Sequence, residues 1–493
     1  MHLTSLPSPY GIGTMGADAR AFVDFLEAAG QSYWQILPIC PTGFGDSPYQ
    51  TFSSFAGNPY LIDLEDLHSE RLLNRSEFEN QVWGSSPLSV DYGILYRQRY
   101  PILRSACQRF SEPHLREYHS FCKHHSFWLE DYATFMALKD AHDGAPWQQW
   151  KKPLRNRDPE ALALARDQLK EEIEFWKRIQ YLFFSQWRTL KACANAKGIQ
   201  MIGDLPIYVA NDSAEVWSHP EQFQLDENRL PIEVAGCPPD GFSAKGQLWG
   251  NPLFDWDYME ETGFEWWIRR IDYQFGIYDV LRIDHFRGFD SYYAIPYGAP
   301  DAKIGRWRKG PGIKLFQAVE QAIGKKQIIA EDLGFLTPSV HALREATGFP
   351  GMKVLQFAFD RRDRGGSLYL PHNYPQHCVV YVGTHDNDTA LGWVRTAPPE
   401  DVAYAVDYLR LHDPDGAHWG MMRSIWASVG DWTIIQMQDI LGLGSEARMN
   451  TPSTVGNNWK WRAAPGFATS ELASKLWYEM DLYDRLPANR KRI

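Results

Sequence analysis

Cysteine is scarce in this chain: six residues in 493, with no two of them forming a CxxC pair. Zinc ribbons and thioredoxin-type redox sites need such pairs, so the sequence supports neither. The six are Cys40, Cys107, Cys122, Cys193, Cys237 and Cys378. Because they are scattered along so long a chain, we expect them to be reduced and mostly buried.

Long apolar runs and an excess of positive charge are also missing. No segment approaches the ~18–20 apolar residues of a membrane span, and the opening residues MHLTSLPSPYGIG lack the basic-then-apolar pattern of a signal peptide. Acidic residues number 61 against 50 basic ones, a net charge of −11, whereas a phosphate-binding surface needs the opposite sign. We therefore expect a soluble cytoplasmic protein that binds neither nucleic acid nor a membrane.

Aromatic residues, in contrast, are abundant, with 20 Trp, 24 Tyr and 26 Phe making up 14% of the chain. Most are expected in the core, but such a surplus also suits a groove that stacks the flat faces of sugar rings. The length exceeds the roughly 250–300 residues at which a single core stops growing. Several domains, or one large barrel with insertions, are therefore expected.

Short continuous apolar runs recur along the chain and predict strands buried on both faces, as in a parallel sheet. Amphipathic stretches between them, such as 17–30, 311–323 and 400–412, predict helices. This alternation indicates an α/β fold, and we predict a (β/α)8 TIM barrel with inserted, mainly helical subdomains. An eighth strand would have to lie in residues 1–3, which are too few for a normal strand. The seven predicted strands are Tyr33–Ile39, Gln200–Ile207, Asp279–His285, Gln327–Asp332, Met352–Phe359, Cys378–Thr384 and Trp432–Gln438.

The spacing of these strands suggests insertions. The gap from Ile39 to Gln200 is too long for one crossover helix, and one long helix over about 159–197 is expected to lead back to the barrel. The stretch 234–250 contains too many Gly and Pro for regular structure. The predicted segments are 1–60 (start of the barrel, first strand truncated), 61–167 (inserted helical subdomain), 168–208 (barrel), 209–264 (second insertion with the loop 234–250) and 265–493 (rest of the barrel and C-terminal helices).

Four of the predicted strands end in an acid: Asp204 in GDLP, Asp284 in RIDHF, Glu331 in AEDLG and Asp386 in THDND. Side chains at the C-terminal ends of barrel strands point into the active site. One such acid alone is equally explained as a helix N-cap. Four at equivalent positions favour a functional cluster, because an acid in a buried strand is costly unless it is paired or functional.

Paired carboxylates of opposite protonation state are what glycosyl transfer requires. Arg282 lies two residues before Asp284 on the same side of its strand, so its charge is expected to keep Asp284 ionised, as a nucleophile must be. Glu331 has no neighbouring cation in the sequence, which is compatible with an acid of raised pKa. A retaining mechanism predicts carboxyl groups ~5–5.5 Å apart.

Several long segments of the sequence make a resemblance specific. They are WQILPICPTGFGDSPYQ, SSFAGNPYLID, GDLPIYVANDSAEVW, GQLWGNPLFDW, RIDHFRGF, IIAEDLG, GTHDNDT and RMNTP. On these segments the chain resembles the 4-α-glucanotransferases, the amylomaltases or disproportionating enzymes of the α-amylase clan. The match runs from Ser5 to Arg462 and thus covers nearly the whole chain.

The resemblance implies a role for each matched residue. Asp284 would be the nucleophile, Glu331 the acid/base, and Asp386 would stabilise the transition state. Asp204, Arg282, His285 and His385 would line the donor subsite, with Tyr49 stacking on its sugar beside Ser47. Trp249 and Asn450 would contact the glucan, and Phe242 belongs to a loop that would close over it. Malto-oligosaccharides and starch- or glycogen-derived glucans are the implied partners, no cofactor or metal is implied, and we expect a monomer or weak homo-oligomer.

Alternative interpretations stay open on the residues alone. An α-amylase-type hydrolase would use the same carboxylates, a metal-dependent barrel would place Asp204, Asp284 and Glu331 on Mg²⁺, and a glucan-binding module would catalyse nothing. Each considered without its motif, His285 and His385 would be read as core histidines, and Tyr49 and Trp249 as packing residues. The group of His114, His119, Cys122, His124 and His125 is expected to be a polar helix face rather than a zinc site.

Overall fold

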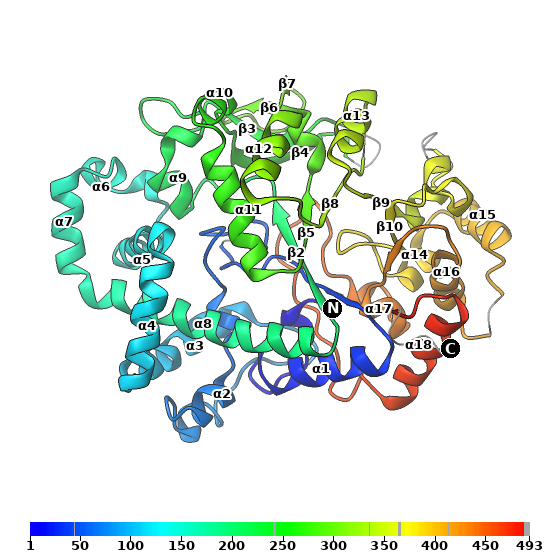
Figure 1. Cartoon of the computed structure of the whole chain (residues 1–493), viewed down its shortest axis with the longest axis horizontal. Helices are drawn as coiled ribbons and strands as arrows, with labels where there is room; N and C mark the ends of the chain where they lie inside the picture. The colour runs from blue at the N-terminus through cyan, green and yellow to red at the C-terminus, as the bar shows by residue number, and fades with distance from the viewer. Residues whose placement is uncertain (44, 240–242, 335, 363–365, 413, 488–493) are drawn as a thin grey trace.

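The protein's structure is a computed structural model that describes all residues except 44, 240–242, 335, 363–365, 413 and 488–493. Its centre is a ring of parallel strands with helices outside (Figure 1). The strands are β1 (Tyr33–Gln35), β2 (Gln200–Pro206), β5 (Val280–Asp284), β8 (Ile328–Ala330), β9 (Gly351–Val354), β10 (Cys378–Tyr381) and β11 (Trp432–Ile434). Six lie within the predicted runs and β9 begins one residue before its run, at Gly351, so all seven predicted strands are confirmed.

The strand order follows the chain, β1-β2-β5-β8 and then β9-β10-β11, and every pairing is parallel. The Ala330 N–H donates to the Pro350 carbonyl at 3.0 Å, which joins β8 to the start of β9. On the other side, the rings of Tyr33 and Trp432 lie 4.9 Å apart and bring β11 beside β1. Inward-facing residues from the seven strands, such as Ile202 and Val379, form one apolar cluster. The ring is therefore filled by side chains, as in a closed barrel.

The chain start occupies the place where an eighth strand would stand, but it is not a strand. Residues Leu3–Ser5 form a 3-10 turn. The Trp34 indole donates to the Met1 carbonyl at 2.7 Å, and the Leu37 N–H donates to His2 Nδ1 at 3.2 Å. Within the described ranges the barrel thus has seven parallel strands, and its first position is filled by a short irregular segment.

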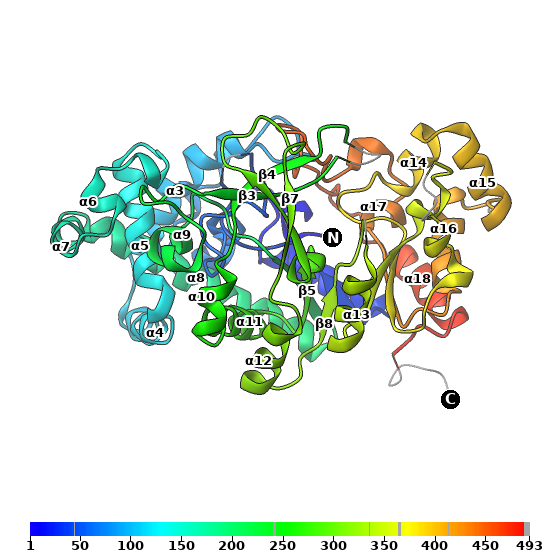
Figure 2. The ribbon, with the colours of Figure 1, turned by 90° about the horizontal axis from the view of Figure 1, so that it is seen from above.

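The helices lie outside this ring (Figures 1 and 2). Those next to the barrel turn an apolar stripe toward it, as α12 does with Leu315, Phe316 and Val319. They are α1 (Ala17–Ala28), α8 (Lys170–Ala196), α11 (Glu265–Ile277), α12 (Ile313–Ile323), α13 (Pro338–Thr347), α14 (Ala390–Thr396), α15 (Pro399–Leu409), α16 (Ala417–Trp426), α17 (Met437–Ile440) and α18 (Ser470–Leu482). None of the helices in the described ranges is both long and apolar enough to cross a membrane.

A group of helices between β1 and β2 gathers on one side of the barrel (Figure 1). They are α2 (Leu64–Ser69), α3 (Tyr92–Gln108), α4 (Glu112–His124), α5 (Ser126–Ala141), α6 (Lys152–Arg155) and α7 (Pro159–Gln168). The prediction of one helix over 159–197 is wrong in one respect, because two helices cover this range. Leu169 separates α7 from α8 and caps both. Its φ of −105° and ψ of 19° leave the helical region, so the chain bends where the sequence pattern continues.

A second sheet corrects the prediction that 234–250 is irregular. Strands β3 (Glu233–Cys237) and β4 (Gln247–Pro252) pair antiparallel with β6 (Ser291–Pro296) and β7 (Arg306–Lys309) in the order β4-β3-β6-β7. The glycine that suggested a loop belongs to the strand, since a Cβ on Gly236 would lie 2.2 Å from the Gln247 carbonyl oxygen. This sheet lies beyond the carboxyl end of β2 (Figure 1). In the sequence, β3 and β4 lie between the short helices α9 (Ala214–Ser218) and α10 (Trp256–Glu261), and β6 and β7 come before β8.

Candidate active site

One arginine joins two of the predicted acids at the carboxyl ends of the barrel strands. Arg282 on β5 donates through Nη1 to both carboxylate oxygens of Asp204 on β2, at 2.7 and 2.6 Å. Its Nη2 lies 3.0 Å from Asp284 Oδ1. The side chains of Arg282 and Asp204 are buried, whereas that of Asp284 is 29% exposed. Asp204 and Arg282 thus form a buried pair that supports Asp284, which alone reaches the open side.

Glu331 is held against the same strand end by backbone donors. The His285 N–H donates to Glu331 Oε2 at 2.6 Å and the Leu333 N–H to Oε1 at 3.1 Å. His285 directly follows Asp284 and has a φ of 53°, in the left-handed region that few non-glycine residues adopt. This turn aims the backbone amide of His285 at the carboxyl group of Glu331. The two predicted catalytic acids are neighbours because β5 and β8 pair side by side.

The two acids have raised pKa values of different size. Desolvation raises the pKa of Glu331 to about 8, with a further contribution from the charge of Asp284, against the opposing effects of Arg282 and the His285 amide. Desolvation also raises the pKa of Asp284 to about 6, because it outweighs the attraction of Arg282. The prediction that Arg282 lowers this pKa is confirmed in direction, but burial has the larger effect. The pKa of Glu331 is therefore raised further than that of Asp284, so Glu331 is the acid of the pair that binds its proton more tightly.

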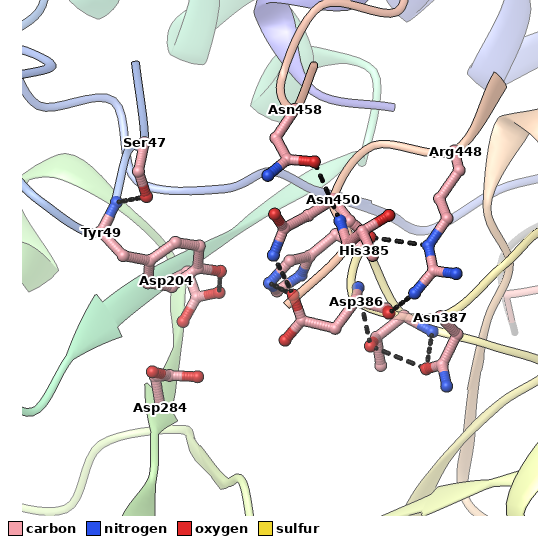
Figure 3. Close-up of polar contacts among 12 residues, drawn as sticks. Ser47, Tyr49, Asp204, Asp284, His385, Asp386, Asn387, Arg448, Asn450 and Asn458 are labelled. Carbon is pink, nitrogen blue, oxygen red and sulfur yellow. Dashed lines mark hydrogen bonds and ion pairs between the residues drawn. The ribbon is translucent and has the colours of Figure 1, made fainter. Parts of the chain in front are cut away.

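A second group of side chains faces the first across the site (Figure 3). Asn450 Nδ2 donates to Asp386 Oδ1 at 2.6 Å, and His385 Nε2 lies 3.4 Å from the same oxygen. The Tyr49 ring stacks on His385 at 5.2 Å, while its hydroxyl donates to Asp204 Oδ2 at 2.7 Å. Tyr49 therefore links the Asp204 side of the site to the side that carries Asp386. In these contacts, both neighbours of the Asp386 carboxylate approach Oδ1, and Oδ2 is left over.

The remaining predicted residues lie around this centre. Trp249 on β4 meets the His285 ring edge-on at 4.8 Å, and burial lowers the pKa of His285 to about 3, so its ring is neutral. The Ser47 hydroxyl accepts from the Tyr49 N–H at 3.2 Å and orders that turn. Phe242 falls outside the described residues. The structure thus places all of the predicted site residues that it describes around one site.

Two residues that the sequence analysis did not select also shape the site. Arg448 donates through Nη2 to the Asp386 carbonyl at 2.6 Å and through Nε to the Asn450 carbonyl at 2.7 Å. The Trp459 ring lies 5.9 Å from Tyr49 and 5.8 Å from His385. Arg448 lies in the RMNTP segment that the sequence analysis selected, so its neighbourhood could be predicted. Its role could not, because an arginine that orients a loop by donating to backbone carbonyls is recognised only once the loop is folded.

The arrangement bears on the metal-dependent alternatives. A shared Mg²⁺ would have to lie between Asp204 and Asp284, where the Arg282 guanidinium already donates to both. Among the side chains that the structure describes, no three His, Cys, Asp or Glu are grouped so as to hold a metal ion. In the histidine-rich helix region, His125 accepts from the Trp128 indole at 3.3 Å and stacks on Phe184, which makes it a packing residue.

Removing the Tyr49 hydroxyl tests the link between the two sides of the site. A hydrogen bond to a charged group is worth about 1.5–3 kcal/mol, so Tyr49→Phe is expected to lower kcat/KM at least about tenfold on the malto-oligosaccharides that the resemblance implies as substrates. Tyr381→Phe is the matched control, because its hydroxyl donates to Gln35 Oε1 inside the barrel at 2.9 Å. That variant should lower the melting temperature and leave kcat/KM unchanged; equal kinetic losses in both would contradict a role for Tyr49 in the site.

A parallel barrel with two carboxyl groups of different pKa at its strand ends is the arrangement that enzymes acting on glycosidic bonds require. Comparison with known proteins makes the class specific, since a family described as 4-alpha-glucanotransferase matches residues 1–468. The chain belongs to this family and is a 4-alpha-glucanotransferase.

Individual relatives agree with this assignment along their whole length. The 4-alpha-glucanotransferase of Clostridium butyricum is 48% identical over 487 residues, which cover 98% of this chain and 100% of that protein. The Thermus thermophilus enzyme of the same name is 50% identical, over 99% of this chain and 98% of its own. The amylomaltase of Streptococcus agalactiae, solved in complex with acarbose, has a TM-score of 0.96 at 43% identity and 99% coverage of both chains. The predicted barrel fold is thereby confirmed.

Proposed function

We propose that the enzyme moves α-1,4-glucan segments from a donor malto-oligosaccharide to the 4-hydroxyl of a second glucan or of glucose, with retention of configuration and without a cofactor. Starch- or glycogen-derived glucans would serve as longer donors. The observation that carries this proposal is the pair of carboxyl groups on β5 and after β8, whose raised pKa values of about 6 and about 8 leave one charged and one protonated.

In the first half-reaction, a carboxylate oxygen of Asp284 forms a bond to the anomeric carbon while the bond from that carbon to the leaving O4 breaks. Glu331 gives its proton to the leaving oxygen, so the departing fragment is a neutral alcohol. The result is a β-linked glycosyl ester on Asp284 and an ionised Glu331. The Arg282 guanidinium, 3.0 Å from Asp284, holds the attacking carboxylate in place.

In the second half-reaction, Glu331 removes the proton from the 4-hydroxyl of the acceptor. That oxygen bonds to the anomeric carbon as the ester bond to Asp284 breaks, and the α-1,4 linkage is restored with both acids in their starting states. In this proposal Asp386 accepts hydrogen bonds from hydroxyl groups of the sugar at the reacting centre, since Asn450 and His385 orient its carboxylate. Acceptor binding and water exclusion decide between transfer and hydrolysis.

The test uses maltotriose as the only substrate, in the presence of a chelator. Disproportionation predicts glucose together with a ladder of maltotetraose and longer products, at a constant total of reducing ends. Rising reducing ends without a ladder would establish hydrolysis instead. Loss of the reaction with the chelator would contradict a mechanism that uses only side chains.

The pH dependence follows from the two carboxyl groups. Activity needs Asp284 deprotonated and Glu331 protonated, so kcat/KM for maltotriose should fall below about pH 6 and again above about pH 8. In Glu331→Gln, whatever activity remains should lose the alkaline fall, because that variant has no proton to lose. An alkaline fall that persists in Glu331→Gln would assign it to another group.

A further inference from the structure

One face of the antiparallel sheet carries a cluster of exposed apolar side chains outside the site. The strand register places Leu248, Gly236, Tyr293 and Trp307 in one row across β4, β3, β6 and β7, so their side chains share a face. Leu248 and Trp307 are exposed, as is Ile304 in the loop that leads into β7, whereas Tyr293 between them is buried. We call the surface that Leu248, Ile304 and Trp307 form over the buried Tyr293 the Trp307 face.

Trp307 differs from the other tryptophans, all 20 of which lie in the part of the chain that the structure describes. It is 41% exposed and is the one Trp among the exposed large hydrophobic residues of that part. The Arg287 guanidinium lies 3.9 Å from the centre of its ring, and the Tyr293 ring meets it at 5.2 Å and 62°. The Tyr293 hydroxyl in turn donates to the Ala302 carbonyl at 3.1 Å. The indole is thus held in one orientation by buried neighbours while much of it remains in solvent.

The Trp307 face is linked to the catalytic site through Arg287. Leu248 precedes Trp249, whose ring contacts His285. Arg287, which packs on Trp307, lies two residues after His285 and is buried. Because successive side chains of a strand point to opposite faces, Leu248 and Trp249 lie on opposite sides of β4, and Arg287 is the residue that connects the two surfaces.

We propose that the Trp307 face is a second binding site for α-1,4-glucan chains, with a sugar ring stacked on Trp307. The inference rests on the proposed function, since its ligand is the polymeric substrate. Glucan rings have apolar faces that stack on indole and hydroxyl groups that accept hydrogen bonds. Exposed Lys245, Lys303 and Lys309 lie around the face, next to Asp301, and supply such donors.

Two other occupants fit this surface less well. If a second copy docked on the Trp307 face about a two-fold axis, the same lysines would meet across the contact, and like charges repel. Addition of a strand to the edge strand β7 is opposed by its sequence RWRK, because charged residues on an edge discourage pairing. A neutral glucan encounters neither obstacle.

The experiment compares Trp307→Ala with Tyr478→Ala, which removes another exposed aromatic ring, from α18, far from β7 in Figure 1. For binding, each substitution is placed in the Asp284→Asn background, in which glucan is not turned over, and the proteins are run on native gels containing soluble starch; kinetics are measured without Asp284→Asn. Trp307→Ala should weaken retention by starch about tenfold in apparent Kd, and Trp307→Phe should recover part of it. Its kcat/KM should fall for starch but not for maltotriose, and Tyr478→Ala should match the parent in both.

Because Trp307 packs on Arg287, Ile304→Asn serves as a second variant that leaves this contact intact, and it should also weaken starch retention. Unchanged retention in both variants would overturn the proposal, as would equal kinetic losses on starch and maltotriose. A dimer that dissociates in Trp307→Ala, with starch retention unchanged, would assign the face to a second copy. Failure of the parent enzyme to disproportionate maltotriose would instead refute the proposed function, whatever the gels show.

Discussion

Replacement of Asp284 by Asn is expected to lower kcat/KM for maltotriose by about 10⁴-fold or more, because an amide forms no glycosyl ester under these conditions. The fold should survive, since Asn keeps the size of the side chain and an oxygen that accepts from Arg282. The measurement is product formation by chromatography, together with a melting curve. A variant that keeps one tenth of the parent activity would contradict the role of Asp284 as nucleophile.

The same chemical change at Asp332 provides the matched control. Asp332 is adjacent to Glu331, but its Oδ1 accepts from the Met352 N–H at 2.7 Å and its Oδ2 lies 3.4 Å from Arg344 Nε. This agrees with the expectation that it has a structural role. Asp332→Asn should therefore lower the melting temperature and change kcat on maltotriose little.

A shorter side chain at position 284 allows a chemical rescue. In Asp284→Ala, azide can enter the space that the carboxylate leaves and attack the anomeric carbon of α-maltosyl fluoride, with fluoride as the leaving group. A single displacement inverts the configuration, so the product should be the β-linked azide. An α-linked azide, or no rescue at all with a folded variant, would argue against attack from the Asp284 side.

Replacement of Glu331 by Gln is expected to have an effect that depends on the leaving group. With maltotriose the loss should be about 10²–10⁴-fold, the usual contribution of a positioned acid/base. With α-maltosyl fluoride the first half-reaction should be nearly unaffected, because fluoride leaves without protonation. The second half-reaction then slows for a sugar acceptor and recovers with azide, which needs no base. Equal losses with both donors would contradict the acid/base role of Glu331.

The sequence predicted the barrel well because its strands are buried on both faces. The runs CVVY and IIA are apolar and fully buried, so their pattern survives without knowledge of their neighbours. The acids were found for the same reason, since an acid that ends such a run conflicts with burial. The antiparallel sheet was missed, because β3 and β4 are rich in glycine and proline and are stabilised by pairing with β6 and β7, far along the chain.

Other features of the site arise only when separate segments meet. The sequence shows that Arg282 lies near Asp284. It does not show that Arg282 Nη1 donates to both carboxylate oxygens of Asp204. The absence of a cation beside Glu331 pointed in the right direction, yet its raised pKa comes from burial and from Asp284 on another strand. The roles of Arg448 and Trp459 depend in the same way on a loop that folds back from residues 448–461 onto the barrel.

Trapping the intermediate tests the central claim most directly. Glu331→Gln, mixed with α-maltosyl fluoride and quenched in acid, should accumulate a glycosylated protein, because the ester forms readily and is consumed slowly. Peptide mass spectrometry should place the added maltosyl group on Asp284 within RIDHF, and addition of azide should remove it. A label on a different carboxylate, or product of inverted configuration with no labelled protein, would contradict transfer through Asp284.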